Sequence, residues 1–509
     1  MKKYLIGVDL GTSGTKAALY RVDGKKIGEA SAEVPIYYPK PGTVEQDQTD
    51  FYETAALTVR TCLESSGIDP REVAAIAFDS QMAGVGLVDE NFEAVARFDS
   101  WLDMRCEPFI QLMDREYGER VTQLTGCPPT CDHGPKMLWW QHEQPAVYQR
   151  TARFVMPGTY VAAQMAGLKA DQAFIDYTYI HFSGFADTQK GEWSSELCAK
   201  FGLDMDKLPT IVEPWQVVGE VSESAARKFG LAAGTLIAAG AGDTAANALG
   251  AGIVEPGMLF DVAGTASVLA SCTDQFVADI KNRALLTMRS VVPGLWNPLA
   301  YIGGGGLALR WFRDQFYNPQ KTIIGENSDA VYAEMMESAA AIAPGSDGLF
   351  FSPHLGGRIC PASPAMRGAW VGVSWSHSQA HFFRAILESV AFEYAYYLRI
   401  LRELLPDLHL TAARVAGGGA RGAAWNQLKA DVLGVPYLRL AGNEFGTWGA
   451  AMIAGKAAGL IENLAEHASQ TAIPDGAVVR PDADRHLAYQ PLVERYIQLE
   501  SMLNRFFIE

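Results

Sequence analysis

Residues 3–22 read KYLIGVDLGTSGTKAALYRV, which is two apolar segments on either side of a short Gly/Thr/Ser stretch. The first segment ends near Asp9, and apolar and polar residues alternate again from Lys16 onward, which predicts a β-hairpin with a glycine-rich tip. Backbone N–H groups and hydroxyls at such a tip can approach phosphate oxygens closely, because glycine has no Cβ. An ordinary hairpin turn accounts for the same residues, so this stretch by itself leaves both interpretations open.

A similar pattern returns about half the chain length later. Residues 258–270 read MLFDVAGTASVLA, so Asp261 precedes a Gly-Thr pair between two apolar segments much as Asp9 does. We interpret the two stretches as the starts of two related halves. The fold is therefore expected to be duplicated, with a hairpin at the beginning of each half.

Chain length and the alternation of local patterns predict the domain organisation. The chain has 509 residues, which exceeds the roughly 250–300 residues that one hydrophobic core serves. We expect two domains, 1–254 and 255–509. Strand-like runs such as 73–78 alternate with helical patterns, the longest of which covers 378–404, and this alternation is typical of an α/β fold.

Charge and cysteine content narrow the class of protein. The formal net charge is −16, so the overall field repels phosphate backbones and anionic membranes, and we expect neither nucleic acid nor membrane as a partner. Seven dispersed cysteines do not make a disulfide framework. No apolar run approaches the ~18 residues of a membrane span. We expect a soluble, cytoplasmic protein with reduced thiols.

Two further stretches could carry chemistry. Gly240-Ala-Gly-Asp243 places a carboxylate directly after an apolar strand, either as a helix N-cap or as a general base that faces a hydroxyl. Gly417, Gly419 and Gly422 match the dinucleotide-binding pattern G-x-G-x-x-G, but they lie far along the chain and lack a suitably placed acid at a strand end. A glycine turn that opens a helix can equally hold the ribose and adenine of ATP, which leaves a dehydrogenase as the weaker alternative.

Taken together, these motifs resemble one family. DLGTSGTK at Asp9–Lys16, GAGD at Gly240–Asp243 and GGGARGAAWNQLKAD at Gly417–Asp431 occur in the order and spacing of the FGGY carbohydrate kinases, and the likeness covers nearly the whole chain. The resemblance implies two ribonuclease-H-like domains of the actin, Hsp70 and hexokinase superfamily. It also implies that ATP, Mg²⁺ and a small sugar meet in the cleft between the domains.

The resemblance implies a role for each matching position. Asp9 would serve the magnesium ion, and Asp243 would be the catalytic base beside the sugar hydroxyl. The positions around ATP would be Gly11, Thr12, Ser13, Thr15, Lys16, Gly264, Thr265, Gly306, Gly418, Gly419 and Ala420. The positions around the sugar would be Gln81, Met82, Ala83, Trp101, Asp103, Arg105, Asp132, His133, Asp176 and Tyr177.

Within the family, the stretches Gln81–Gly84 and Trp101–Arg105 are most similar to the sugar-contacting motifs of xylulokinases, which implies D-xylulose as the substrate. Ala83 stands where xylulokinases carry histidine, and Thr244 stands where they carry asparagine or glutamine. Loss of a group that pairs with a substrate hydroxyl changes specificity. Another ketose, a polyol or a sugar acid therefore stays open as the substrate, and an actin/Hsp70-like ATPase switch or sugar sensor stays open as the function. The resemblance also leaves a homodimer open.

Overall fold

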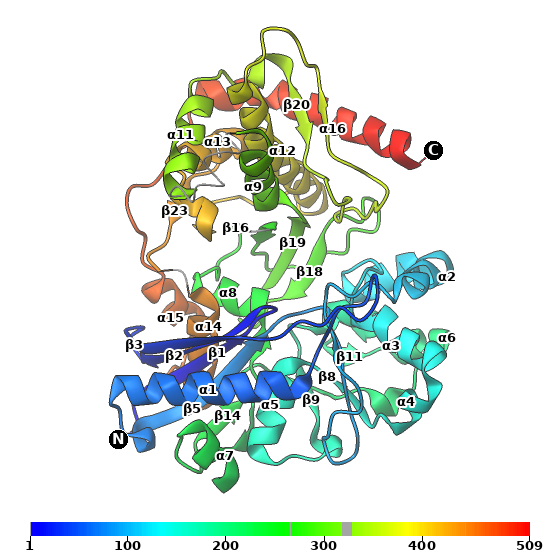
Figure 1. Ribbon diagram of the computed structural model, residues 1–509, viewed down its shortest axis with the longest axis vertical. Coiled ribbons are helices and arrows are strands. Elements are labelled where there is room, and N and C mark those ends of the chain that lie inside the picture. The colour runs from blue at the N-terminus through cyan, green and yellow to red at the C-terminus, as the bar shows by residue number, and fades with distance from the viewer. Residues whose placement is uncertain (1, 265, 318–327, 443, 509) are drawn as a thin grey trace.

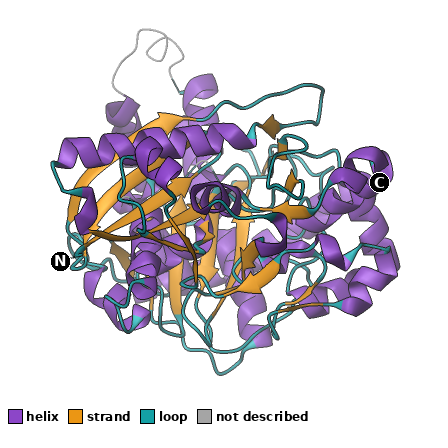
Figure 2. Ribbon diagram, turned by 90° about the horizontal axis from the view of Figure 1, so that it is seen from below, coloured by secondary structure: helices purple, strands orange, loops and turns teal. Residues whose placement is uncertain are grey.

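The structure of the protein is a computed structural model, which describes residues 2–264, 266–317, 328–442 and 444–508. Each half of the chain contributes one large sheet, with the first half below and the second half above in Figure 1. Helices lie outside the strands when the molecule is viewed from below (Figure 2). The two chain ends lie at opposite ends of the molecule.

The first sheet begins with the predicted hairpin. Its strands are β1 (Tyr4–Leu10), β2 (Gly14–Arg21), β3 (Lys26–Glu33), β5 (Val73–Ser80), β13 (Val217–Glu220) and β14 (Leu236–Ala238), in the order β13-β14-β5-β1-β2-β3, and β15 (Ala241–Gly242) also pairs with β5. β1, β2 and β3 are antiparallel neighbours, whereas β5 is parallel to β1 and β14 is parallel to β5.

The second sheet repeats this arrangement. Its strands are β16 (Met258–Ala263), β17 (Ser267–Ser271), β18 (Leu286–Arg289), β19 (Trp296–Ile302), β22 (Ala412–Ala416) and β23 (Tyr437–Arg439), in the order β18-β19-β17-β16-β22-β23. β16, β17 and β19 are antiparallel neighbours, and β22 and β23 run parallel to β16. Five strands therefore have the same order and direction in both sheets. The expected duplication of a ribonuclease-H-like unit, and the two-domain α/β fold class, are confirmed.

The remaining elements connect and cover the sheets. The helices of the first half are α1 (Gln48–Ser66), α2 (Glu107–Thr125), α3 (His133–Glu143), α4 (Pro145–Arg150), α5 (Pro157–Ala166), α6 (Ser195–Phe201), α7 (Glu223–Phe229) and α8 (Asp243–Gly250). Those of the second half are α9 (Gly305–Phe316), α11 (Ser328–Ala340), α12 (Gln379–Leu404), α13 (Ala423–Leu433), α14 (Phe445–Ala457), α15 (Leu464–Thr471) and α16 (Ala483–Ile508). The short strands are β4 (Glu45–Gln46), β6 (Gly86–Val88), β7 (Phe98–Asp99), β8 (Arg153–Val155), β9 (Phe174–Asp176), β10 (Ala186–Asp187), β11 (Glu192–Trp193), β12 (Thr210–Val212), β20 (Phe350–Ser352) and β21 (Ala369–Val371).

After β23 the chain returns to the first sheet. α14 and α15, coloured orange, lie with the blue strands of the first half (Figure 1). Side chains alternate across β1, so Ile6 and Val8 pack into the cluster that contains α1, whereas Leu5 packs into the cluster that contains α14. A Cβ on Gly7 would lie 1.8 Å from the carbonyl oxygen of Thr447, so only glycine admits α14 at this distance.

The domain limits 1–254 and 255–509 remain a proposal. Because α14 and α15 pack on the first sheet, a late segment of the chain adds to the domain that this sheet forms. None of the helices in the described ranges combines the length and the apolar character that a membrane crossing requires.

Candidate active site

Three aspartates gather at one edge of the first sheet. Asp9 near the end of β1 is the register partner of Asp79 on the parallel strand β5. Ala241 of β15 is also paired with Asp79, and Asp243 follows as the first residue of α8. Because the carboxyl ends of parallel strands meet at the same edge, the three carboxylates lie close together. Asp79 is fully buried, whereas Asp9 and Asp243 keep a partial opening to solvent.

Burial and mutual repulsion make these carboxylates hard to ionise. Desolvation raises the pKa of Asp9 to about 6, against the opposing pull of Lys16. Desolvation and the neighbouring charge of Asp9 raise the pKa of Asp243 to about 7. The pKa of Asp79 is raised well above its usual range by burial and by both neighbouring carboxylates. Neither oxygen of Asp79 accepts a hydrogen bond from an N–H or O–H of the described residues.

The donor set of this cluster fits a magnesium ion. Mg²⁺ prefers carboxylate oxygens together with water, and a buried carboxylate that lacks hydrogen-bond donors is costly unless a cation compensates it. Asp79 is such a group. Lys16 offsets part of the charge on Asp9, but its Nζ also lies 3.2 Å from Oε2 of Glu444, which precedes α14, so its charge is shared.

The tip of the first hairpin is a closed turn in which the backbone N–H of Gly11 donates to the carbonyl of Gly14 at 3.0 Å. Trp101 Nε1 donates to Thr12 Oγ1 at 2.8 Å and so holds the side of the tip. The hydroxyl of Thr15 is buried against Thr54 of α1, with the two Oγ1 atoms 2.8 Å apart. Gly11 and Thr12 therefore lie together at the tip, whereas the Thr15 side chain is turned toward the core.

A cavity of about 670 Å³ in the second half brings together four of the positions expected around ATP. These positions are Gly264, Gly306, Gly418 and Gly419. The cavity wall also contains Leu309 and Arg310 from α9 and Tyr332 and Met336 from α11, which the sequence motifs did not indicate. Trp425 from α13 lines it as well; this residue lies in the motif Gly417–Asp431 but had no assigned role. Thr265 lies outside the described residues, and Ala420 follows Gly419 in the short 3₁₀ turn Gly418–Arg421.

Glycine determines the shape of this cavity. A Cβ on Gly419 would lie 2.6 Å from the ring of Trp425, whereas a Cβ on Gly418 would meet no atom within 4 Å. Gly419 thus permits close packing against Trp425, and Gly418 faces open space. An apolar, partly aromatic hollow of this kind suits a flat heteroaromatic ring such as adenine.

A second group of expected positions contains buried polar atoms without partners. Among the described residues, Asp132 Oδ1, both ring nitrogens of His133 and Gln81 Oε1 have no hydrogen-bond partner. Both ring nitrogens of His181, which the sequence motifs did not indicate, are unpartnered as well. Buried polar groups in native proteins are almost always paired. So many unpaired donors and acceptors in one region point to a polar ligand.

Tyr179 connects this region to the aspartate cluster. Its hydroxyl lies 2.6 Å from Ser80 Oγ and donates to the carbonyl of Ala241 at 2.9 Å, so it bridges the ends of β5 and β15. Its ring centroid lies 6.2 Å from that of His133. The unpartnered polar groups are therefore adjacent to the strand that delivers Asp243.

The other positions expected around the sugar bond to one another, pack against the strand ends or stay partly exposed. Arg105 donates to both oxygens of Asp103 and to Glu45 Oε1, so these side chains are engaged with one another. Trp101 stays 39% exposed beside the hairpin tip. Met82 is buried against Gly242, and Ala83 adopts a left-handed φ of 61° in the loop after β5.

Asp176 and Tyr177 have different surroundings. Asp176 Oδ1 accepts from the backbone N–H and the hydroxyl of Thr178, and Thr178 Oγ1 in turn accepts from the N–H of Gly242. Asp176 thus braces the residue before Asp243. Tyr177 donates to the carbonyl of Val291 at 2.9 Å and lines another cavity, of about 360 Å³. The structure does not bring Tyr177 to the unpartnered polar groups.

Asp79 is the most important residue that sequence reasoning missed. A signal was present, because this acid follows the strand run expected at 73–78 in the same way that Asp9 ends the first strand. The local pattern could not show that β5 lies parallel to β1, with Asp79 and Asp9 in register.

Comparison with known proteins gives a consistent result. A model of the FGGY family of carbohydrate kinases, N-terminal domain, matches residues 4–250, and the corresponding C-terminal domain model matches residues 262–458. The xylulose kinase of Bacillus subtilis (strain 168) is 28% identical over 496 residues, which cover 97% of this chain and 96% of that protein. The gluconokinase of the same organism is 26% identical over 521 residues, with 100% and 98% covered. The crystal structure of xylulose kinase from Rhodospirillum rubrum matches with a TM-score of 0.89 at 26% identity, with 100% of each chain covered.

Proposed function

The chain belongs to the FGGY family of carbohydrate kinases and is an ATP-dependent sugar kinase, and on that premise we propose that its acceptor is D-xylulose, phosphorylated at the terminal hydroxyl. Xylulose kinases are among its relatives over almost the full chain length. A gluconokinase is similar over the full length as well. The choice of sugar must therefore be argued from the residues of the pocket.

The observation that carries the proposal is the set of unpartnered polar side chains next to Asp243. Gln81, Asp132 and His133 are each at least 98% buried and still offer free hydrogen-bonding atoms. A polyhydroxylated ligand would satisfy these atoms, since each sugar hydroxyl both donates and accepts a hydrogen bond. Tyr179 joins this region to the strand that precedes Asp243, so a sugar held there presents one end to the Asp243 carboxylate.

The electrostatics of the pocket favour a neutral sugar. Burial lowers the pKa of His181 to about 3 and lowers the pKa of His133 well below its usual range, so both imidazoles are neutral at pH 7. Burial also raises the pKa of Asp132 well above its usual range. Lys136, the cation that acts on Asp132 and His133, is engaged with the backbone oxygen of Cys131 at 3.2 Å and its Sγ at 3.1 Å. A sugar acid would need a free cation to pair with its carboxylate, so a ketose fits better than gluconate.

Asp243 has the properties of a general base. It retains access to solvent, and its pKa is raised to about 7, which matches a proton acceptor that works near neutral pH. Its Oδ1 accepts from the backbone N–H of Thr244 at 2.6 Å, which holds one face of the carboxylate. The other oxygen would accept the proton of the sugar hydroxyl as that oxygen attacks the γ-phosphorus of ATP.

The cavity around Gly418 would hold the nucleotide, and the N–H groups of Thr12 and Ser13 at the hairpin tip would face the phosphates, whereas the N–H of Gly11 donates to Gly14 within the turn. Asp9 and Asp79 would hold Mg²⁺, which neutralises charge on the phosphate oxygens when bound.

The proposal is tested with a product screen. The purified protein is incubated with MgATP and single ketoses, polyols or sugar acids, and phosphorylated products are identified by mass spectrometry alongside ADP release. D-Xylulose should give a monophosphate with the highest kcat/KM of the panel. A preference of tenfold or more for gluconate or a polyol would overturn the substrate assignment. ADP release without a phosphorylated product would favour an ATPase switch instead.

A further inference from the structure

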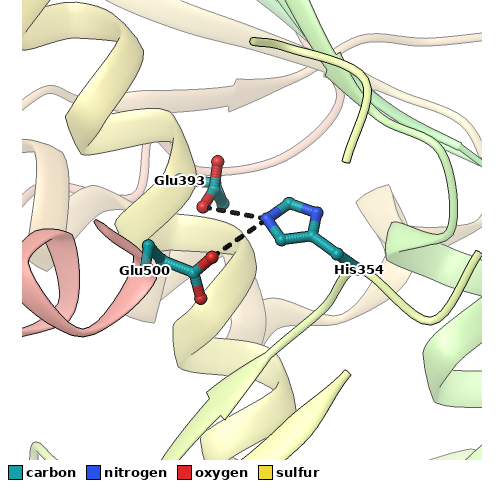
Figure 3. Close-up of side chains that lie close together, drawn as sticks. All are labelled: His354, Glu393 and Glu500. Carbon is teal, nitrogen blue, oxygen red and sulfur yellow. Dashed lines mark hydrogen bonds and ion pairs between the residues drawn. The ribbon is translucent and has the colours of Figure 1, made fainter. Parts of the chain in front are cut away.

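A buried group of ionisable side chains lies in the second half, apart from the nucleotide cavity. His354 follows β20, Glu393 lies in α12 and Glu500 lies in α16, and their side chains point toward one another (Figure 3). Each side chain is no more than 2% exposed. His354 Nε2 lies 3.3 Å from Glu393 Oε1 and 3.3 Å from Glu500 Oε2. None of the three residues lines the cavity around Gly418.

Hydrogen bonding in this group is unequal. Glu393 accepts from Arg358 at 3.0 Å, from the hydroxyl of Tyr496 at 2.9 Å, and from His354. In contrast, neither carboxylate oxygen of Glu500 has a hydrogen-bond partner among the described residues. A buried carboxylate without a donor carries a desolvation cost of several kcal/mol. The positive group opposite Glu500 is His354 Nε2, 3.3 Å from Oε2, which it shares with Glu393.

The distances suit a metal ion better than a shared proton. Hydrogen bonds from N–H to oxygen are usually about 2.9 Å long, and a single Nε2–H cannot point at two carboxylates at once. Ligand atoms bound tetrahedrally at about 2.0 Å from zinc lie about 3.3 Å apart. Both separations from His354 Nε2 match this spacing, and one ligand atom from each of the three residues falls within 4.8 Å of the others.

We propose that His354, Glu393 and Glu500 bind a divalent transition-metal ion, with Zn²⁺ the best match, and that this ion fastens α16 to α12. An imidazole with two carboxylates is a ligand set for zinc and its neighbours, whereas magnesium and calcium favour oxygen ligands alone. Both carboxylates face His354 Nε2 at 3.3 Å, so this nitrogen lies where a positive charge is stabilised. The metal would replace the proton on that nitrogen.

A fourth ligand can come from water, because the nearby Tyr397 hydroxyl interacts with Glu393. Because the site is closed to solvent and joins residues from three segments, the ion would be structural and would be taken up during folding.

The first experiment needs no variant. The protein is unfolded and refolded with excess chelator, then titrated with Zn²⁺ or Co²⁺ while thermal unfolding is followed. A stoichiometric amount of Zn²⁺ should bind and raise Tm by several degrees, and Co²⁺ should show the visible absorption of a low-symmetry, four-coordinate complex. If neither metal binds below about 10 μM and Tm does not move, the group is an ion-pair network and the proposal is wrong.

Variants then locate the site. Glu500→Gln should weaken Zn²⁺ binding about 100-fold or more and abolish the Tm shift. Glu494→Gln makes the same change on the same helix at a 60% exposed position, and it should leave binding unaltered. His381→Gln removes a partly buried imidazole near the protein surface, which lies 3.1 Å from the exposed Asp347. Loss of metal in His381→Gln with retention in Glu500→Gln would assign the ion to the surface and overturn the proposal.

Discussion

Asp9 and Asp79 face each other as register partners on the parallel strands β1 and β5, although both are acids. Like charges on adjacent strands are destabilising, and Asp79 is fully buried with no hydrogen-bond donor among the described residues. A pair of this kind is retained where a cation or a phosphate-bound metal compensates it. We therefore expect the strand edge of the first half to be less stable than it could be, in return for the proposed cation site.

Asp79→Asn should make the metal-free protein more stable at high pH. The folded-state pKa of Asp79 is raised, so its contribution to stability is fully present below the unfolded pKa and is lost as pH rises through the folded pKa. Thermal unfolding in EDTA should show a Tm several degrees above wild type at pH 8, and the difference should vanish near pH 4. Asp171→Asn, the same change at an exposed position, should have no effect at either pH.

The same Asp79→Asn variant should need more magnesium. If Asp79 is a ligand, its loss should raise the Mg²⁺ concentration for half-maximal rate about tenfold or more. Initial rates over a magnesium titration at saturating ATP measure this directly. An unchanged magnesium dependence would show that Asp79 is not a ligand of the ion.

Asp243→Asn should lower kcat by about 10²–10⁴-fold, because that is the usual contribution of a general base. Nucleotide affinity should stay near wild type, since the cavity around Gly418 lies in the other half of the fold. Steady-state kinetics and calorimetric titration with ADP separate the two effects. Turnover close to wild type in the folded variant would show that another group accepts the proton.

The rate should fall on the acid side of neutrality. The proposed base Asp243 would work only when it is deprotonated, and burial raises its pKa to about 7, so kcat/KM for the sugar should rise with pH through that region. A bound cation favours the charged carboxylate and should move the inflection to lower pH. Profiles at limiting and saturating Mg²⁺ test both statements. A rate that is flat between pH 5 and pH 8 would contradict the assignment.

Gly418→Leu should fill the cavity proposed for the nucleotide without disturbing the fold. A side chain at Gly418 would extend into open space, so the Tm should change little. KM for ATP should rise about tenfold or more, while KM for the sugar should stay the same. Gly356→Leu is the matched control, because a Cβ there also meets no atom within 4 Å but the residue does not line the cavity.

Asp261 should prove structural. Although it repeats the position of Asp9 in the second hairpin, it is fully buried, forms an ion pair with Lys429 of α13 and accepts from the hydroxyl of Tyr394 at 2.9 Å. Lys429→Met would leave this charge unpaired and should destabilise the protein by about 3–5 kcal/mol. Urea unfolding of the single variant and of Asp261→Asn/Lys429→Met should show that the double variant recovers most of the loss.

Much of the fold could be predicted from local pattern. The helix expected over 378–404 is α12, and its start is held by a capping box between Ser378 and His381. Both hairpins formed where apolar alternation meets glycine. Four of the five glycines expected around ATP, all except Gly11, meet at one cavity. Thr15 and Tyr177 were expected at the ATP and sugar sites, but their side chains turn toward the core and toward another cavity. A motif places a residue in the chain but does not say toward which neighbour its side chain turns.

By itself, the sequence determined the two hairpins, the α/β class and the order of the motifs, because strand alternation and glycine turns depend on neighbouring residues. Only the tertiary structure decided that Asp79 joins Asp9, that Asp261 is neutralised by Lys429, and that α14 packs back onto β1. These relations join residues that are far apart in the chain, and each depends on which strand or helix lies next to which. Whether an acid is a metal ligand, a base or one side of an ion pair follows from that packing, since the same carboxylate behaves differently beside a lysine, another carboxylate or open solvent.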